Sequence, residues 1–145
     1  MRFMMLMIPA VYQVAKGQKA GADFVPTAEA VERMTKYNAE LAKAGALISL
    51  DGLHAPATGA RVSFSKGTPK VTDGPFTESK EVLGGYWMIR AGSRKEAIEW
   101  ATRVPADEGD VIEVRQVFDE SDFPQDVQKA AQNDTIKAWV DKNKK

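Results

Sequence analysis

The chain has 145 residues and equal numbers of acidic and basic side chains, so its formal net charge is zero. This balance disfavours nucleic-acid binding, which requires a basic excess or a basic stripe. The sequence lacks cysteine, which excludes disulfides and thiolate chemistry, and it has a single histidine, His54, which excludes a zinc site made of several imidazoles.

The N-terminal run from Phe3 to Ile8 is apolar at every position and is followed by Pro9. A short continuous run of this kind predicts a central strand that is covered on both faces. The run is too short for a membrane helix, which needs about 20 apolar residues, and no small-residue cleavage site of a signal peptide follows it. We therefore expect a cytoplasmic protein without membrane association.

The next two predicted elements are a helix and a strand. Thr27 is a suitable N-cap, apolar residues follow it at helical spacing, and Gly45 is a natural stop. Residues 15–26, before the helix, are expected to form a loop. Residues 46–53 predict a second strand, and His54 follows it directly.

A hairpin and a tight turn come next. Residues 60–65 alternate between polar and apolar side chains, and residues 70–72 return after a turn, which predicts a β-hairpin. The sequence Asp73-Gly74-Pro75-Phe76 then stops the strand and turns the chain. We expect the Asp73 carboxylate to accept a hydrogen bond from the backbone N–H of Phe76.

The second half repeats the order strand, helix, strand. Residues 82–90 are apolar on both faces and predict another central strand. Ser93 and Glu96 match a capping box, which predicts a second helix that ends at Pro105. Residues 111–117 predict the last strand of the sheet.

The last strand carries a charged pair on one face. Glu113 and Arg115 alternate with Ile112 and Val114, so the charged pair lies away from the helices if the apolar pair packs against them. The charged pair would then recognise a polar ligand, fix the register of a dimer, or remain solvated at a sheet edge. The sequence leaves these alternatives open.

The C-terminal segment is polar at first, and from Val127 onward it predicts a third helix with an apolar stripe. The stripe consists of Ile136, Trp139 and Val140. An isolated helix is marginal in water, so this one is expected to dock on another surface. We divide the chain into a domain, 1–118, and a C-terminal extension with a helix, 119–145.

The element order predicts an α+β protein with a ferredoxin-like antiparallel sheet, both helices on one face, and an inserted β-hairpin. The central strands are apolar on both faces, although the helices cover only one. We expect the same face of a second copy to cover the other, which makes the protein a homodimer.

The segment from Val71 to Trp87 reads VTDGPFTESKEVLGGYW and resembles the signature of the DGPF branch of the YCII-related family. Four further segments agree with that family: RFMMLMI at 2–8, GLH at 52–54, EAIEWA at 96–101 and IEVRQVF at 112–118. The resemblance implies a dimeric α+β barrel, in which two ferredoxin-like units pack sheet to sheet around a cavity.

The resemblance also implies a setting. The wider superfamily includes small-molecule enzymes such as monooxygenases, lactone isomerases and dehydrochlorinases, which generally work without a metal. DGPF proteins tend to be encoded beside alternative sigma factors, which implies a stress response. Many YCII-related proteins carry a catalytic histidine and aspartate at the positions of Met34 and Val104 here, so that dyad is not carried over.

Two functions remain open. The first is a small-molecule-binding homodimer that acts as an acid–base enzyme without a metal or cofactor. Histidine is the residue type whose unperturbed pKa suits proton transfer near neutral pH, His54 is the single histidine, and Asp73 could orient it. The candidate ligand-binding residues are Glu113, Arg115, Tyr86 and Phe76. The second is a non-catalytic module that senses a ligand or binds a protein such as a sigma factor. In that case His54 closes a hairpin, Asp73 caps a turn and Tyr86 belongs to the core.

Overall fold

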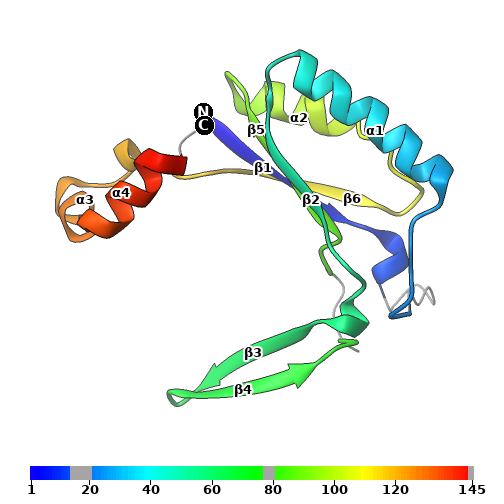
Figure 1. The fold of residues 1–145 in the computed structure, drawn as a ribbon, viewed down its shortest axis with the longest axis horizontal. Coiled ribbons are helices and arrows are strands. Elements are labelled where there is room, and N and C mark those ends of the chain that lie inside the picture. Colours follow the sequence, from blue (N-terminus) through cyan, green and yellow to red (C-terminus); the bar gives the residue numbers. More distant parts are fainter. Residues whose placement is uncertain (14–20, 77–80, 144–145) are drawn as a thin grey trace.

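A computed structural model describes residues 1–13, 21–76 and 81–143 of the chain (Figure 1). It contains a four-stranded antiparallel sheet with the strand order β2-β5-β1-β6. These strands are β1 (Arg2–Ile8), β2 (Leu47–Gly52), β5 (Gly85–Arg90) and β6 (Val111–Gln116). The architecture is α+β and compatible with the predicted ferredoxin-like fold. The predicted loop at 15–26 lies partly outside the described residues.

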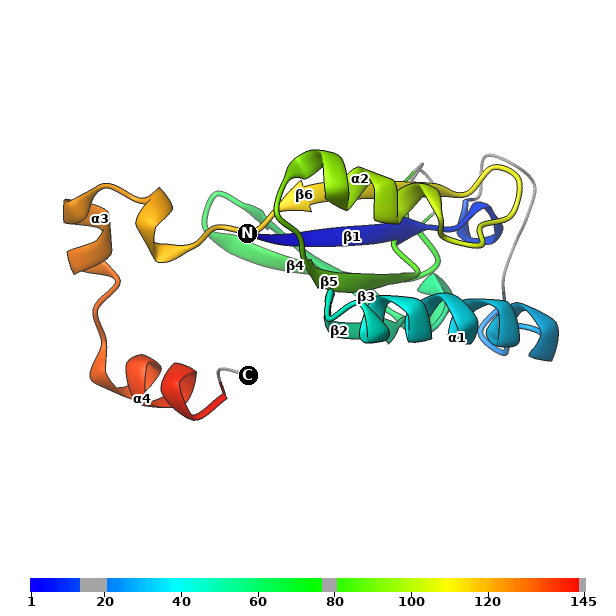
Figure 2. The same ribbon diagram turned by 90° about the horizontal axis from the view of Figure 1, so that it is seen from above.

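Two helices, α1 (Ala28–Lys43) and α2 (Arg94–Thr102), lie on the same face of the sheet (Figures 1 and 2). The Thr27 side chain accepts a hydrogen bond from the Ala30 backbone N–H, as expected of an N-cap. Gly45 follows the helix with φ of 69°, a left-handed conformation that glycine adopts without steric cost. The predicted start and stop of α1 are therefore confirmed.

The capping box of α2 is only half formed as predicted. The Ser93 hydroxyl accepts a hydrogen bond from the Glu96 N–H at 3.1 Å. The Glu96 carboxylate accepts one from Gly92 N–H at 2.7 Å, one residue before the N-cap. The carboxylate still pairs a free backbone donor near the positive end of the helix dipole.

The core lies between the sheet and the two helices. Its fully buried large side chains come from both layers and are Phe3, Met5, Leu41 and Ile89. Trp87 also points into this core, where its indole N–H donates to Asn38 Oδ1 at 2.8 Å. The Tyr37 ring meets the Trp87 ring edge to face, with centroids 6.0 Å apart. The two polar aromatic side chains of this core, Tyr37 and Trp87, are thus packed against each other and hydrogen-bonded.

Strand β5 begins later than the sequence predicts. Val82, in the predicted strand, instead forms hydrogen bonds with Gln13 in the segment after β1, where η1 (Ala10–Tyr12) forms a short 3₁₀ helix. A second small core of Tyr12, Ala55 and Val82 lies there. Residues 82–84 of the predicted strand are therefore not part of β5.

The hairpin forms a separate two-stranded sheet from β3 (Ala60–Ser65) and β4 (Thr68–Asp73). Every residue of the two strands is exposed. In Figure 1 the hairpin stands off the sheet on the side opposite α1 and α2. The short helix η3 (Pro56–Thr58) lies at its base.

The C-terminal segment contains two helices, so the prediction of one helix is wrong. These are α3 (Gln125–Ala130) and α4 (Asp134–Asn143), and neither has a buried residue. The break occurs because the Asn133 side chain accepts hydrogen bonds from the N–H groups of Thr135 and Ile136, which starts a new helix.

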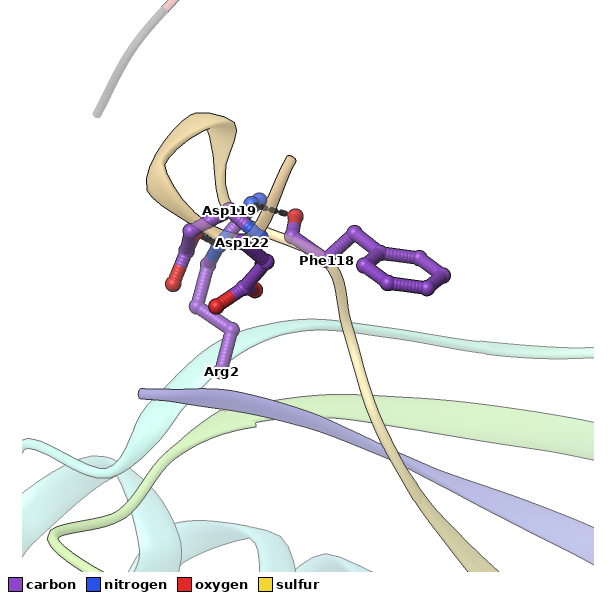
Figure 3. A network of polar contacts seen from close by, with 4 residues as sticks. All are labelled: Arg2, Phe118, Asp119 and Asp122. Atoms are coloured by element: carbon purple, nitrogen blue, oxygen red, sulfur yellow. Dashed lines mark hydrogen bonds and ion pairs between the residues drawn. The ribbon is translucent and has the colours of Figure 1, made fainter. Parts of the chain in front are cut away.

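The C-terminal segment is fastened to the sheet at its beginning, where the turn η4 (Glu120–Asp122) follows β6. Figure 3 shows the Arg2 guanidinium beside Asp119 and the Phe118 carbonyl. No helix among the described residues is both long and apolar enough to cross a membrane.

Candidate functional site

The sheet face opposite α1 and α2, here called the open face, carries two rows of side chains across the strands. Cross-strand pairing aligns residues from β2, β5, β1 and β6 in each row. The acidic row consists of Asp51, Tyr86, Leu6 and Glu113. The basic row consists of Ser49, Met88, Met4 and Arg115. Each row has two large side chains in the middle and polar side chains at its ends.

The burial of these residues follows the same division. The middle residues Met4, Leu6, Tyr86 and Met88 are half-buried, and the end residues are exposed. An apolar centre with a polar rim is the usual anatomy of a protein interface. The open face therefore has the composition of a surface that another molecule covers.

Glu113 and Arg115 lie on the open face, as the sequence predicts. Ile112 and Val114 pack against the core on the helix side, which turns the charged pair the other way. Strand β6 is an edge strand, so both charged side chains are exposed. Within residues 1–13, 21–76 and 81–143, neither has an ion-pair partner.

Tyr86 is held by a residue that the sequence analysis did not select. Its hydroxyl donates a hydrogen bond to Asp51 Oδ2 at 2.9 Å. Asp51 lies within the second predicted strand, residues 46–53, for which the sequence predicts no functional residue. The signal that could have found it is the alternation along β2, which places Asp51 on the same face as Ser49.

His54 follows β2 and is exposed to solvent. The chain just before it is fixed, because Leu53 N–H donates to the Gly84 carbonyl and the Leu53 carbonyl accepts from the Tyr12 hydroxyl. In the part of the chain that the structure describes, the imidazole has no hydrogen-bonding or ion-pair partner. The side chain is thus accessible but is not oriented by a neighbour.

Asp73 ends β4, opposite Ala60. The hydrogen bond expected between its carboxylate and Phe76 N–H is not formed, and neither is a hydrogen bond or ion pair with His54. The turn is held instead by Gly74 N–H, which donates to the Gly59 carbonyl at 2.8 Å. The structure therefore places Asp73 at the hairpin base without joining it to His54.

Gly74 explains why this turn needs its sequence. A Cβ atom at Gly74 would lie 1.8 Å from the carbonyl oxygen of Pro56, far inside van der Waals contact. The backbone of the turn can approach η3 only because residue 74 has no side chain. The structure thus shows a packing role for the glycine of the turn.

Phe76 is half-buried beside the hairpin base. The guanidinium of Arg61 lies over its ring, 4.0 Å from the centroid. This distance is typical of a cation–π contact, which here joins β3 to the turn. The ring is therefore engaged by its own chain.

Two tyrosines have shifted acidities, and both are structural. Burial raises the pKa of Tyr37 to about 12, with a lowering effect of Arg103 and a raising effect of Glu40. Burial also raises the pKa of Tyr12. Their hydroxyls donate to the carbonyls of Trp100 and Leu53, respectively. Both groups therefore keep their protons near neutral pH and hold the fold together.

Away from the open face, the described residues form a cavity but no cluster suited to a metal ion. Among the described residues, no group of three or more His, Cys, Asp or Glu side chains is arranged to hold a metal ion. An open cavity of about 400 Å³ lies at the end of β5 that is remote from His54. Its lining includes Met1, Gly45, Arg90, Glu96 and Trp100. None of the candidate catalytic or ligand-binding residues lines this cavity.

Comparison with known families gives one match. Residues 1–121 match the model of a family described as the YCII-related domain. No curated protein matches the chain. The matched residues include the four-stranded sheet, α1, α2 and the β3–β4 hairpin, and they end before α3.

Proposed function

This chain belongs to the YCII-related family, and from that membership and its open face we propose that it is a homodimer that binds a small molecule between its two copies. The observation that carries the proposal is the composition of the open face. Four large, half-buried side chains lie in its middle, while both helices cover the other side of the sheet. The same face of a second copy would remove these side chains from water.

The charges of the two rows favour one orientation of the copies. A two-fold axis that lies across the strands, between the rows, reverses the strand direction of the second copy. The acidic row of one copy then faces the basic row of the other. Glu113 meets Arg115 of the second copy, and the symmetry repeats this pair. In this proposal Glu113 and Arg115 fix the register of the dimer.

The proposed ligand chamber lies between the two open faces, beside Tyr86 and Asp51. Their hydrogen bond supplies a polar group next to apolar side chains, a usual combination in small-molecule sites. His54 follows β2 directly after this pair and is free to act as a general acid or base. The resemblance of residues 71–87 to the DGPF signature supports the further proposal that the chain belongs to that branch of the family and that the dimer is an α+β barrel.

The specific observation that favours a non-catalytic function concerns His54. Catalytic histidines are usually oriented by a second group, and His54 has no such partner among the described residues. Under this alternative the chamber senses a ligand, and the dimer passes the signal to a protein partner such as a sigma factor.

The dimer is tested by charge reversal. Arg115→Glu places like charges opposite each other and is expected to raise the dimer dissociation constant by about tenfold or more in sedimentation velocity. The double variant Glu113→Arg/Arg115→Glu restores the attraction and the dimer. Arg94→Glu, on the exposed side of α2, is the matched control and leaves the mass unchanged. A double variant as weak as the single one would contradict the proposed register.

The ligand and the role of His54 are tested together. A thermal-shift screen of small metabolites identifies a ligand, because binding to the folded state raises the melting temperature. With the compound found, turnover is compared between the wild type and His54→Ala. A loss of about 10²–10⁴-fold supports acid–base catalysis. Unchanged turnover rejects that role for His54, and binding without turnover in the wild type supports the sensing function.

A further inference from the structure

The β3–β4 hairpin has one apolar side and one polar side. Val62 pairs with Val71 across the strands, and Phe64 follows Val62 on the same side of β3. These three residues, here called the hairpin face, are exposed, and Phe64 is the most exposed of them at 75%. The other side of the hairpin carries Ser63 and Thr72. A two-stranded hairpin is marginally stable in water, so a cover on the hairpin face would stabilise it.

The base of the hairpin is fastened to the rest of the molecule. The Leu53 N–H donates a hydrogen bond to the Gly84 carbonyl at 2.9 Å, which joins the chain before the hairpin to the chain after it. At the turn that follows β4, the Gly74 N–H donates to the Gly59 carbonyl at 2.8 Å. These contacts fix the direction in which the hairpin leaves the sheet.

The hairpin lies on the same side of the sheet as the open face. Figures 1 and 2 show it opposite α1 and α2, running back from its base beneath the open face. The C-terminal segment from Asp119 onward, here called the tail, extends past the ends of the strands instead (Figure 1). A molecule that covers the open face therefore lies beside the hairpin.

The area of the open face is small for a stable interface. Four strands of six or seven residues, spaced about 4.8 Å apart with a rise of about 3.4 Å per residue, present roughly 400 Å². Two such faces in contact cover roughly 800 Å², whereas stable protein interfaces bury about 1,200–2,000 Å². By the same spacings one side of the hairpin presents about 200 Å², so two hairpins and the surfaces that they cover add about 800 Å². The hairpins thus supply the area that the sheet faces lack.

We propose that the hairpin is an arm, and that the hairpin face of each copy packs against the second copy of the homodimer. This inference rests on the proposed homodimer, in which the second copy covers the open face. Every strand residue of the hairpin is exposed in one copy, so the hairpin does not pack on its own sheet. The two-fold symmetry repeats the contact, and each copy is then held by the arm of the other.

Sedimentation velocity of Phe64→Ala tests the arm. The substitution removes the largest side chain of the hairpin face, at both symmetric contacts, and is expected to raise the dimer dissociation constant by about tenfold or more. The matched control is Thr72→Ala, an exposed position on the polar side of the same hairpin, and it leaves the dissociation constant unchanged. Neither side chain is buried, so the body keeps its fold in both variants.

Thiol labelling reports the cover directly. The sequence has no cysteine, so Val71→Cys places a single thiol on the hairpin face and Thr72→Cys places one on the polar side. Maleimide labelling of Val71→Cys is expected to slow as the chain concentration rises through the dimer dissociation constant. Labelling of Thr72→Cys is expected to keep the same rate over that range.

The outcomes separate the arm from the homodimer on which it rests. A wild type that stays monomeric overturns both. A dimer that Phe64→Ala and Thr72→Ala leave equally strong overturns the arm and leaves the homodimer standing. Slow labelling of Val71→Cys at every concentration, the monomer included, would place the hairpin on its own sheet. Fast labelling in the dimer would leave the hairpin face to a different protein, and either of these results also overturns the arm.

Discussion

The body of the molecule and its two projecting segments differ in how they obtain their stability. In the body, the sheet and two helices enclose a core in which Met5, Leu41 and Ile89 are completely buried. In the hairpin every strand residue is exposed, and in α3 and α4 no residue is buried. The body thus has a buried core of its own, whereas the hairpin strands and the two C-terminal helices bury no side chain within a single copy.

The sequence patterns of the two regions explain the difference. The central strands of the body are apolar on both faces, so each can pack against the helices and against a second layer. The hairpin strands are apolar on one face only, and the stripe of α4 is narrow. Isolated helices and two-stranded hairpins of this kind are only marginally stable in water.

The largest effect is expected in the core of the body. Leu41→Ala removes a side chain with no exposed surface and leaves a cavity, so it is expected to lower the free energy of unfolding by about 2–5 kcal/mol. Phe64→Ala, in the hairpin, is expected to change it by less than about 0.5 kcal/mol. Urea unfolding at concentrations that keep the chain monomeric measures both. Equal losses would contradict the division into body and projections.

A smaller effect is expected where the hairpin meets the body. Gly74→Ala forces a Cβ atom against the Pro56 carbonyl and is expected to cost about 1–3 kcal/mol. Gly52→Ala is the matched control, because a Cβ atom there has no neighbour within 4 Å. It is expected to be neutral or to stabilise by up to about 1 kcal/mol. Thermal unfolding compares the two, and a harmless Gly74→Ala would show that the turn can move away from η3.

The buried hydroxyl of Tyr37 makes the stability of the core depend on pH. The pKa of Tyr37 is raised to about 12, above the ordinary value of 10.0. Between these values the unfolded chain loses the proton and the folded chain keeps it, so the free energy of unfolding falls as pH rises. The stability from this group is complete below pH 10. Tyr37→Phe is expected to show a shallower fall in urea unfolding between pH 10 and 12, and an identical slope would exclude this role.

The smallest effect is expected at the tail. The ion pair of Arg2 and Asp119 is partly exposed, so Arg2→Ala is expected to cost about 0.2–1 kcal/mol of global stability. Hydrogen exchange at residues 119–131 is expected to accelerate while the body keeps its protection. Lys36→Ala, which removes an exposed pair within α1, is the control and leaves the tail unchanged. Tail exchange that does not respond to Arg2→Ala would show that another contact fastens it.

Most of the sheet and both of its helices could be predicted, because local signals specify them. The cap at Thr27, the stop at Gly45 and the apolar run after Arg2 each act within a few residues. The break in the tail was missed, although Asn133 is a good N-cap, because the apolar stripe beyond it gave the stronger helical signal. Local signals thus fail where a single polar side chain interrupts a favourable pattern.

The candidate site was predictable only in part. Alternation along β6 placed Glu113 and Arg115 correctly, because side-chain direction in a strand is a local property. The pairing of Asp51 with Tyr86 depends on the register of β2 with β5. These two strands are separated in the sequence by the hairpin, so no local signal fixes their register. The roles of His54 and Asp73 stay predictions, because they depend on what occupies the open face.

The ligand chamber that we propose exists only if a second copy covers the open face. Sedimentation equilibrium of the unmodified chain over a range of micromolar concentrations measures this most directly. We predict a mass of twice the 15.9 kDa chain, which decreases when Arg115→Glu is introduced. A folded species of 15.9 kDa throughout that range would show that no second copy covers the open face.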